Sequence, residues 1–346
     1  MNFKSDNVVG VCPEIMQAVM DANHGDQSSY GADEYSLKLK KVFSDVFEKD
    51  VDVYLTSTGT ASNSLALSSL VSPHQAIYCH QDAHINTDEC GAPEFYTGGA
   101  KLISIDGENG KMNLPALKKS IQVGLSLRPH TSQPGCVSLT QSTEWGTVYS
   151  LEELRRFHEL AQEYHLQMHM DGARFANSLV SLNCTPAELT WKSGIDILSF
   201  GATKNGAMAG EAVVIFNHKY ANDFDYLQKR AGQLMSKTRF FASQFLAYFK
   251  NDLWLKNAAH ANKMAQALAA LFKQHGFPIQ CPVEANEIFV ELPSFLADKL
   301  LKQGHFFYEW GCPGSNVYRF VTSCFTTLQE IESFGCDLGE LNPDKK

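Results

Sequence analysis

The chain has 346 residues, 44% of them hydrophobic and 19% charged, which is typical of a globular protein large enough for two domains. Its formal net charge of −9 argues against non-specific nucleic-acid binding, which requires a basic surface. No apolar stretch reaches the ~18 residues of a membrane span, and the first residues lack the apolar core of a signal peptide, so neither is expected.

Nine cysteines are scattered along the chain, and none forms a C-x-x-C pair. Their odd number and wide spacing favour reduced thiols in a cytoplasmic protein over a disulfide framework or a zinc site. The pairs His80/His84 and His165/His169 have i,i+4 spacing but lack the carboxylate pattern of known metal motifs. We therefore expect a cytoplasmic location and no bound metal.

The first 35 residues are predicted to form an N-terminal arm of loops with one short helix over 13–22. Pro13 suits the first turn of that helix. Residues 25–35 are polar and contain two glycines, which indicates an exposed or interface loop. Apolar residues at helical spacing then predict a helix over 37–47.

From residue 51 to residue 216 the pattern alternates between apolar strands and amphipathic helices. Strands are predicted at 51–55, 75–79, 102–105, 135–141, 166–170, 195–200 and 211–216, and helices at 62–71, 115–125 and 150–164. The last helix begins at a capping box formed by Ser150 and Glu153. This alternation predicts an α/β fold whose mainly parallel mixed sheet is sandwiched by helices.

Helices dominate after residue 219, with a break at 236–239 and a long amphipathic helix over 254–273. Short strands are then expected at 277–281, 287–292, 305–310 and 316–324, and helices near 294–303 and 326–334. We therefore predict two domains: a large domain over residues 1–249, which includes the arm over 1–35, and a small C-terminal α+β domain over 250–346.

Two of the predicted strands end in residues with a specific chemistry. Asp171 follows strand 166–170, and Lys204 follows strand 195–200 in a segment of small residues. A lysine between two buried strands is unusual, because the ammonium group normally stays in water. Pyridoxal phosphate enzymes of the aminotransferase type need this pair: the lysine forms a Schiff base with the cofactor aldehyde, and the aspartate pairs with the pyridinium nitrogen.

A phosphate site is predicted at the turn over residues 56–61, which includes Gly59 and Thr60. Small residues between a strand and a helix expose backbone N–H groups at the helix N-terminus. The turn is neither a dinucleotide fingerprint nor a P-loop, so this interpretation depends on the phosphate cofactor already indicated. His84 and Glu144 also follow predicted strands, and we expect them beside Asp171 and Lys204, because ligands gather at the carboxyl ends of parallel strands.

Together these residues resemble the L-threonine aldolases, a family of pyridoxal phosphate lyases with the aminotransferase-type, fold type I architecture. The most specific part of the resemblance is Asp171-Gly172-Ala173-Arg174, followed about thirty residues later by Lys204. The supporting matches run from end to end: Ser5-Asp6, Tyr30-Gly31 with Asp33, Gly59-Thr60, His84, Glu89-Cys90-Gly91-Ala92, Arg239, and Arg319-Phe320-Val321-Thr322.

The resemblance implies the residues that would hold the cofactor. Lys204 would be the Schiff-base lysine, Asp171 would hold the pyridinium proton, and His84 would stack on the ring. Gly59 and Thr60 would hold the phosphate, and Arg239 would reach it from a neighbouring subunit.

The resemblance also implies the substrate site. Ser5, Arg174 and Arg319 would bind the substrate carboxylate, and Tyr30 would lie near the site, across a subunit interface. Glu144 stands where the family commonly has a histidine near the substrate hydroxyl, and a buried carboxylate could act there as the base. A second departure is Asn205 between Lys204 and Gly206, where the family often has glycine directly after the lysine.

The implied activity is cleavage of the Cα–Cβ bond of L-threonine, L-allo-threonine or related β-hydroxy-α-amino acids such as phenylserine, giving glycine and an aldehyde. The implied assembly is a homo-oligomer, a dimer or tetramer, with active sites at the subunit interface. Two alternatives stay open: another fold type I enzyme, either a β-eliminating lyase or an aminotransferase, and a non-catalytic homologue that binds the cofactor.

Overall fold

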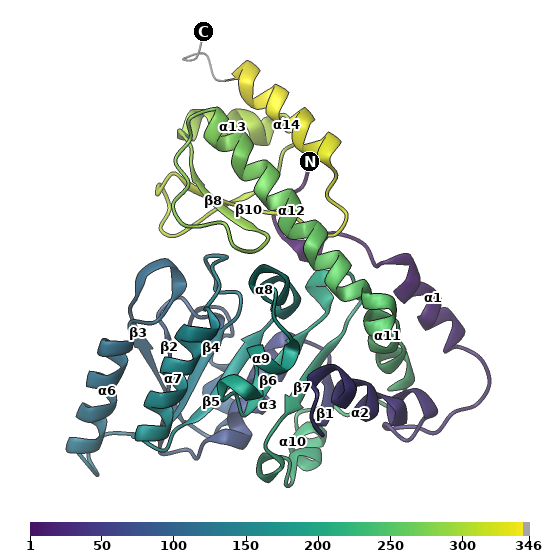
Figure 1. The fold of residues 1–346 in the computed structure, drawn as a ribbon, viewed down its shortest axis with the longest axis vertical. Helices are drawn as coiled ribbons and strands as arrows, with labels where there is room; N and C mark the ends of the chain where they lie inside the picture. Colours follow the sequence, from purple (N-terminus) through teal and green to yellow (C-terminus); the bar gives the residue numbers. More distant parts are fainter. Residues whose placement is uncertain (342–346) are drawn as a thin grey trace.

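A seven-stranded mixed sheet forms the centre of the large part of the protein (Figure 1). The computed structural model describes residues 1–341. The order is β1-β7-β6-β5-β4-β2-β3; the strands from β6 to β3 run parallel, and β7 is antiparallel to both β6 and β1. The strands are β1 (Asp52–Thr56), β2 (Gln75–His80), β3 (Lys101–Ile105), β4 (Gln133–Thr140), β5 (Gln167–Gly172), β6 (Ile197–Gly201) and β7 (Glu211–Ile215). The predicted α/β fold with a mainly parallel sheet is confirmed.

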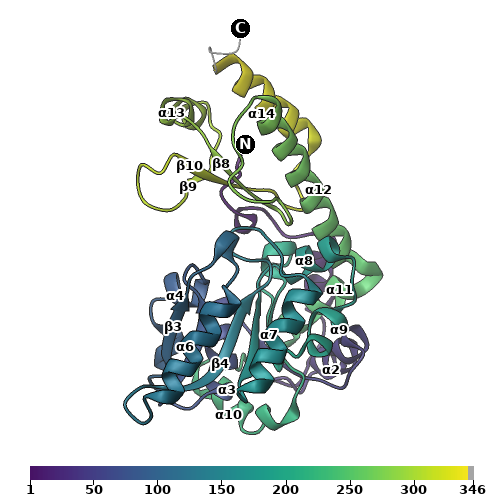
Figure 2. The ribbon, with the colours of Figure 1, turned by 60° about the vertical axis from the view of Figure 1, so that its left-hand side comes forward.

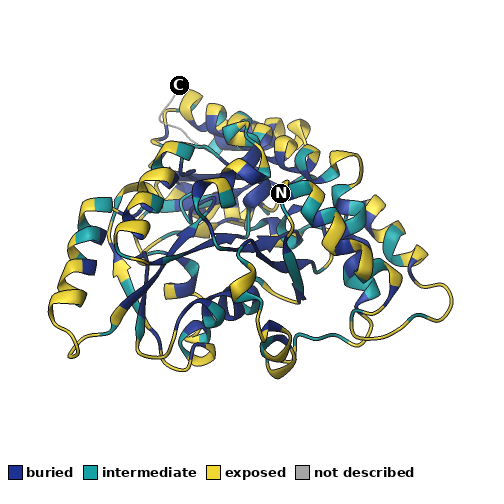
Figure 3. Cartoon of the chain, turned by 60° about the horizontal axis from the view of Figure 1, so that its bottom comes forward, coloured by how far each residue is buried: buried dark blue, intermediate teal, exposed yellow. Residues whose placement is uncertain are grey.

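Helices cover both faces of this sheet (Figures 1 and 2). One face packs on α2 (Glu34–Phe47), α6 (Leu114–Ser126), α7 (Leu151–Glu163), α8 (Phe175–Leu182) and α11 (Arg239–Phe249). The other face packs on α3 (Gly59–Leu70) and α10 (Phe224–Arg230). The central strands are consequently buried on both sides, as Figure 3 shows, while the outer surfaces of the helices are exposed.

Most predicted helices are confirmed, including α1 (Pro13–Asp21) and the capping box of α7. Two helices begin three residues earlier than predicted, because a side chain caps each of them: Asp33 accepts the Ser36 backbone N–H at α2, and Thr58 accepts the Ala61 backbone N–H at α3. The loop predicted after β2 contains two short helices, α4 (His84–Thr87) and α5 (Ala92–Tyr96). Among residues 1–341, no helix is long and apolar enough to cross a bilayer.

A second sheet, with the order β8-β10-β9, lies above the large one in Figure 1. It consists of β8 (Glu287–Glu291), β9 (Tyr308–Glu309) and β10 (Val317–Val321), packed with α12 (Leu253–Gln274), α13 (Ser294–Lys302) and α14 (Leu328–Leu341). The N-terminus joins this core, because Phe3 is buried in it and Asn2 pairs with Phe306.

Two strand predictions in this region are wrong. Residues 277–281 form only an isolated bridge between Ile279 and Val290, and the strand expected over 305–310 is reduced to β9. Pro278 in the first segment cannot donate a backbone hydrogen bond, which explains why no regular ladder forms there. Helix α14 is longer than predicted at its C-terminal end.

Phe200, on β6, lies at the centre of an aromatic cluster that joins the sheet to α2, α8, α11 and α12. Its ring centroid is 5.7 Å from those of Phe43 and Phe175 and 6.0 Å from that of Trp254, and its side chain is fully buried. We expect Phe200→Ala to lower the free energy of unfolding by about 3–5 kcal/mol in urea denaturation. Phe95→Ala, at a residue that is 78% exposed, is the control, with an expected change of about 0.5 kcal/mol or less. Equal effects of the two substitutions would contradict this placement.

Candidate active site

A cavity opens where the parallel strands of the large sheet end. It is lined by Gly59 and Asn63 of α3, by His84 and Glu89 after β2, and by residues at or just after the ends of β4, β5 and β6: Thr140, Ser142, Thr143, Glu144, Asp171, Ala173, Arg174 and Lys204. Six residues predicted from the sequence therefore meet here: Gly59, His84, Glu144, Asp171, Arg174 and Lys204.

Lys204 lies in a tightly held turn between β6 and β7. The side chain of the next residue, Asn205, donates hydrogen bonds to the Tyr248 hydroxyl at 2.7 Å and to the Trp254 carbonyl at 2.8 Å. Gly206 has a φ of +102°, and a Cβ there would lie 2.4 Å from the Cys12 sulfur, so only glycine fits. The inserted Asn205, noted as a departure in the sequence, thus anchors the turn that presents Lys204.

Asp171 is buried at the end of β5, and both of its carboxylate oxygens are held. Oδ2 accepts from Asn63 Nδ2 at 2.8 Å, and Oδ1 accepts from the Ala173 backbone N–H at 3.0 Å. His84 is held by Glu89, because its Nδ1 lies 2.8 Å from Glu89 Oε1. The hydrogen bond to Glu89 raises the pKa of His84 above its usual value, against the effect of burial.

Glu144 is a half-buried residue beside His84, and its Oε1 accepts the His84 backbone N–H at 2.9 Å. The other oxygen, Oε2, is buried without a hydrogen-bond partner among the described residues. Burial, with a smaller contribution from Asp171, raises the pKa of Glu144 to about 7. Glu144 can therefore exchange a proton near neutral pH.

Two arginines lie at the side of the site that faces the small sheet, and buried carboxylates hold both of them. Arg174 makes a two-point contact with Asp6, Nε–Oδ2 at 2.8 Å and Nη2–Oδ1 at 3.0 Å, and its Nη1 lies 3.2 Å from Glu287 Oε2. Arg319, on β10, lies 3.7 Å from the other oxygen of Glu287. Burial alone would raise the pKa of Asp6, but Arg174 and Lys204 outweigh it and lower that pKa.

Ser5 is adjacent to this pair of arginines, because it caps the short helix that starts at Asp6 and its hydroxyl lies 3.3 Å from Asp6 Oδ1. Sequence reasoning missed the roles of Asp6 and Glu287. Asp6 directly follows Ser5, a predicted substrate residue, so its position in the sequence indicated a place near the site. Glu287 lies in a strand with no distinguishing pattern.

Five predicted residues do not line the cavity of a single chain: Ser5 and Arg319, described above, and Thr60, Tyr30 and Arg239. Thr60 lies beside Gly59 in the first turn of α3. Tyr30 is 50% exposed in the arm, and Arg239, at the start of α11, donates from Nη1 to the Gly25 carbonyl at 3.0 Å. Their roles stay predictions.

The groups around the cavity fit pyridoxal phosphate. Four buried polar atoms of lining residues have no partner among the described residues: Asn63 Oδ1, Glu89 Oε2, Ser142 Oγ and Glu144 Oε2. The space a Cβ of Gly59 would occupy is open, which leaves the N-terminus of α3 accessible to a phosphate. An amine, a carboxylate and a helix N-terminus match the aldehyde, the pyridine nitrogen and the phosphate of this cofactor.

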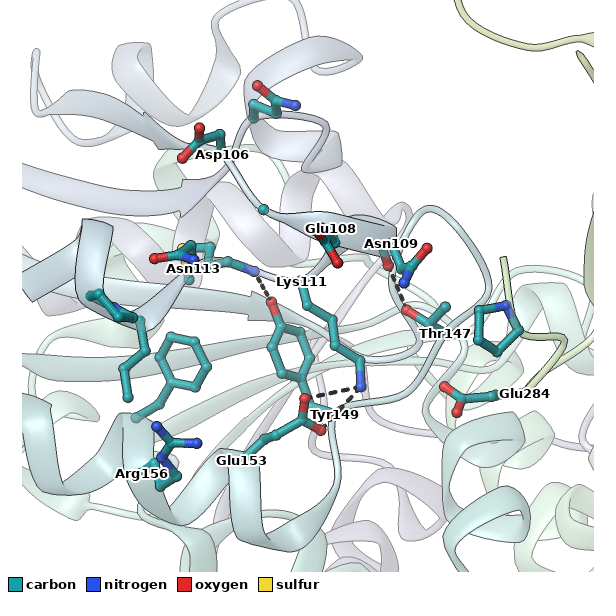
Figure 4. Close-up of a pocket in the computed structure, with 17 residues that line it drawn as sticks. Asp106, Glu108, Asn109, Lys111, Asn113, Thr147, Tyr149, Glu153, Arg156 and Glu284 are labelled. Carbon is teal, nitrogen blue, oxygen red and sulfur yellow. Dashed lines mark hydrogen bonds and ion pairs between the residues drawn. The ribbon is translucent and has the colours of Figure 1, made fainter. Parts of the chain in front are cut away.

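A larger cavity of about 950 Å³ lies elsewhere, between the loop after β3, α7 and residues 282–284 (Figure 4). Lys111 there pairs with Glu153 at 3.0 Å, so opposite charges within its wall neutralise one another. It contains none of the predicted catalytic, cofactor or substrate residues. The smaller cavity at the strand ends is therefore the candidate active site.

Comparison with known proteins gives a consistent result. Residues 2–294 match the model of the beta-eliminating lyase family. The chain is 42% identical over 338 residues to the low specificity L-threonine aldolase of Pseudomonas sp. (strain NCIMB 10558), covering 97% of this chain and 96% of that protein. The structure of Leishmania major threonine aldolase superposes with a TM-score of 0.92 at 29% identity, covering 98% and 99% of the two chains. An archaeal alanine:glyoxylate aminotransferase shares the fold, with a TM-score of 0.71 at 15% identity over 100% and 91%.

Proposed function

The chain belongs to the L-threonine aldolase family of the beta-eliminating lyases, and from this we propose that it is a pyridoxal phosphate-dependent lyase acting on L-threonine, L-allo-threonine and related β-hydroxy-α-amino acids. The reaction breaks the Cα–Cβ bond and yields glycine and an aldehyde. The observation that carries this proposal is the convergence of Lys204, Asp171, His84 and Arg174 on one cavity.

The cofactor would be held by residues from separate elements. Lys204 would carry it covalently through its aldehyde, Asp171 would pair with the ring nitrogen, and His84 would stack on the ring. Gly59 and Thr60, at the N-terminus of α3, would hold the phosphate. When bound, pyridoxal phosphate draws electrons away from the α-carbon of an amino acid attached to it.

The substrate carboxylate would bind at the two arginines. A guanidinium can grip a carboxylate with two parallel hydrogen bonds, which a lysine cannot do. Asp6 accepts from Nε and Nη2 of Arg174, and Glu287 lies beside Nη1 of Arg174 and beside Arg319, so both guanidinium groups are held in place before a substrate arrives. Binding of the carboxylate by these arginines orients the substrate and thereby selects the bond that breaks. Ser5 supports Arg174 through its contact with Asp6.

Glu144 would accept the proton of the substrate β-hydroxyl. Its ionised form is the one that can act as a base, and its pKa of about 7 places the change in protonation near neutral pH. This assigns to a carboxylate the role that a histidine commonly has in the family.

The pH dependence of the reaction tests this assignment. Because the base must be ionised, we expect kcat/KM to rise about tenfold per pH unit below pH 7 and to level off above it. Glu144→Gln is expected to remove this limb and to lower kcat by about 10²–10⁴-fold, since glutamine cannot accept the proton. A pH–rate profile of the variant that keeps the limb of the wild-type protein would rule Glu144 out as the base.

A product assay tests the function itself. L-threonine is expected to give equal amounts of glycine and acetaldehyde, and phenylserine is expected to give glycine and benzaldehyde. A keto acid without an aldehyde would instead indicate an aminotransferase, and no product from any member of a β-hydroxy amino acid panel would indicate a non-catalytic homologue.

We also propose a homo-oligomer, a dimer or tetramer, with sites at the subunit interface, and a cytoplasmic location. Tyr30 and Arg239 lie outside the cavity of their own chain, which supports a role for both in the active site of a neighbouring subunit. All nine cysteines are free, as is usual in a reducing compartment. Size-exclusion chromatography with light scattering tests the oligomeric state.

A further inference from the structure

Two buried side chains in the wall of the cavity, Glu89 and Asn63, have no role in the reaction as proposed so far. The Glu89 side chain has no exposed surface, and its Oε1 lies 2.8 Å from His84 Nδ1. The same oxygen accepts a hydrogen bond from Asn63 Nδ2 at 2.9 Å, and that nitrogen also donates to Asp171 Oδ2 at 2.8 Å. One continuous hydrogen-bonded series thus runs from His84 through Glu89 and Asn63 to Asp171.

The donors and acceptors in this series can be assigned from their chemistry. An ionised carboxylate only accepts hydrogen bonds, so His84 must carry a proton on Nδ1 to bond Glu89. The two hydrogens on Asn63 Nδ2 serve the two carboxylates, one each. The reversed amide would place Asn63 Oδ1 against both Glu89 and Asp171, with acceptor facing acceptor, so only one orientation of this amide is satisfied.

We propose that Glu89 and Asn63 are positioning residues for the reaction proposed above: Glu89 holds His84 as the tautomer with its proton on Nδ1, and Asn63 holds Glu89 and Asp171 at a fixed separation. The role of these two residues in a reaction rests on the proposed function. It assigns to Asn63 the role of the shared donor without which two buried carboxylates would face each other unscreened.

The consequence for His84 is that the protonation state of its other ring nitrogen, Nε2, is fixed. The side chain is 41% exposed and lines the cavity, and the structure gives Nε2 no hydrogen bond to a described residue. With the proton held on Nδ1, Nε2 of neutral His84 is left as a hydrogen-bond acceptor. The consequence for Asp171 is an orientation that does not depend on whether the cofactor is bound.

Four charged or titratable groups surround His84 and bear on its titration. Glu89 and Asp171 favour the protonated ring and Lys204 opposes it, while Glu144 accepts the backbone N–H of the same residue. Since Glu89 is the largest of these influences, removing its charge should change the titration of His84 more than any distant substitution.

Nuclear magnetic resonance of the full-length protein, loaded with pyridoxal phosphate and ¹⁵N-labelled at histidine, tests the role of Glu89. His84→Gln identifies the His84 signals. The wild-type protein is expected to show the Nδ1–H tautomer, and Glu89→Gln, which keeps the shape of the side chain, is expected to lower the pKa of His84 by about one unit or more. Asp88→Asn, at an exposed neighbouring carboxylate, is the matched control and is expected to leave the titration near its wild-type position.

An Nε2–H tautomer in the wild-type protein, or an unchanged titration in folded Glu89→Gln, would overturn the proposal for Glu89. The tautomer is observed without turnover. A protein that fails the L-threonine assay but shows the Nδ1–H tautomer therefore contradicts the proposed function and not this arrangement.

Cofactor binding tests the role of Asn63. We expect Asn63→Ala to raise the dissociation constant for pyridoxal phosphate about tenfold or more, the scale of one lost hydrogen bond to a charged group, and to leave the KM for L-threonine within about twofold. Ser69→Ala on the same helix is the control, and Asn63→Ser is the substitute if the alanine variant does not fold. Wild-type cofactor affinity in a folded Asn63 variant would overturn the proposal for this residue.

Discussion

Lys204→Ala is expected to abolish covalent attachment of pyridoxal phosphate and to lower kcat by about 10³-fold or more. The reason is that no other amine lies among the residues that line the cavity, so nothing replaces the nucleophile. The visible absorbance of the bound cofactor and the rate of aldehyde release measure the two effects on one sample.

Lys192→Ala is the matched control for this substitution. Lys192 is 41% exposed and pairs with Glu48 at 2.8 Å on the protein surface, far from the cavity lining. Its loss should leave both cofactor attachment and turnover near the wild-type values. Retention of the cofactor absorbance band in Lys204→Ala would mean that the cofactor is attached elsewhere.

Asp171→Asn is expected to have the second largest effect, a loss of about 10²–10³-fold in kcat. The substitution keeps the shape of the side chain but removes the charge that would pair with the ring nitrogen, and fixed charges of this kind contribute on that scale. Asparagine would also have one acceptor oxygen for two donors, so its NH2 group would face either Asn63 Nδ2, which now donates to Oδ2 at 2.8 Å, or the Ala173 backbone N–H, which now donates to Oδ1 at 3.0 Å. We therefore expect weaker cofactor binding together with the lower rate.

A second aspartate of the large sheet serves as the control. Asp196 precedes β6, at the end of the sheet opposite the cavity, and its Oδ2 accepts the Met168 backbone N–H at 3.0 Å. Asp196→Asn is expected to change stability modestly and kcat little. Equal losses of kcat in the two variants would show that the effect of Asp171→Asn is structural.

The parts of the fold that local pattern determines could be predicted from the sequence. Continuous apolar runs predicted the buried parallel strands, and small residues after Thr56 indicated the N-terminus of α3. Lys204 and Asp171 were identifiable because a charged residue at the end of a buried strand has few structural uses. The same apolar pattern predicted too much strand over 277–281 and 305–310, because Pro278 cannot donate to a ladder in the first segment and the second keeps only the short, exposed strand β9.

The supporting contacts of the site could not be predicted from local pattern. Asn286 donates to Asp6 across a sequence separation of 280 residues, and Asp6 in turn holds Arg174. Such pairs depend on how the N-terminal segment crosses between the two sheets, which no periodicity within a single element encodes. Asn63 is a similar case, since its function comes from two carboxylates that reach it from other parts of the chain.

The central claim is that the amine of Lys204 carries pyridoxal phosphate. Reduction of the purified, cofactor-loaded protein with borohydride, followed by digestion and mass spectrometry, tests it most directly. We expect the pyridoxyl group on the peptide that contains Lys204 and on no other lysine peptide. An unmodified Lys204 peptide, or a modification on a different lysine, would contradict the account.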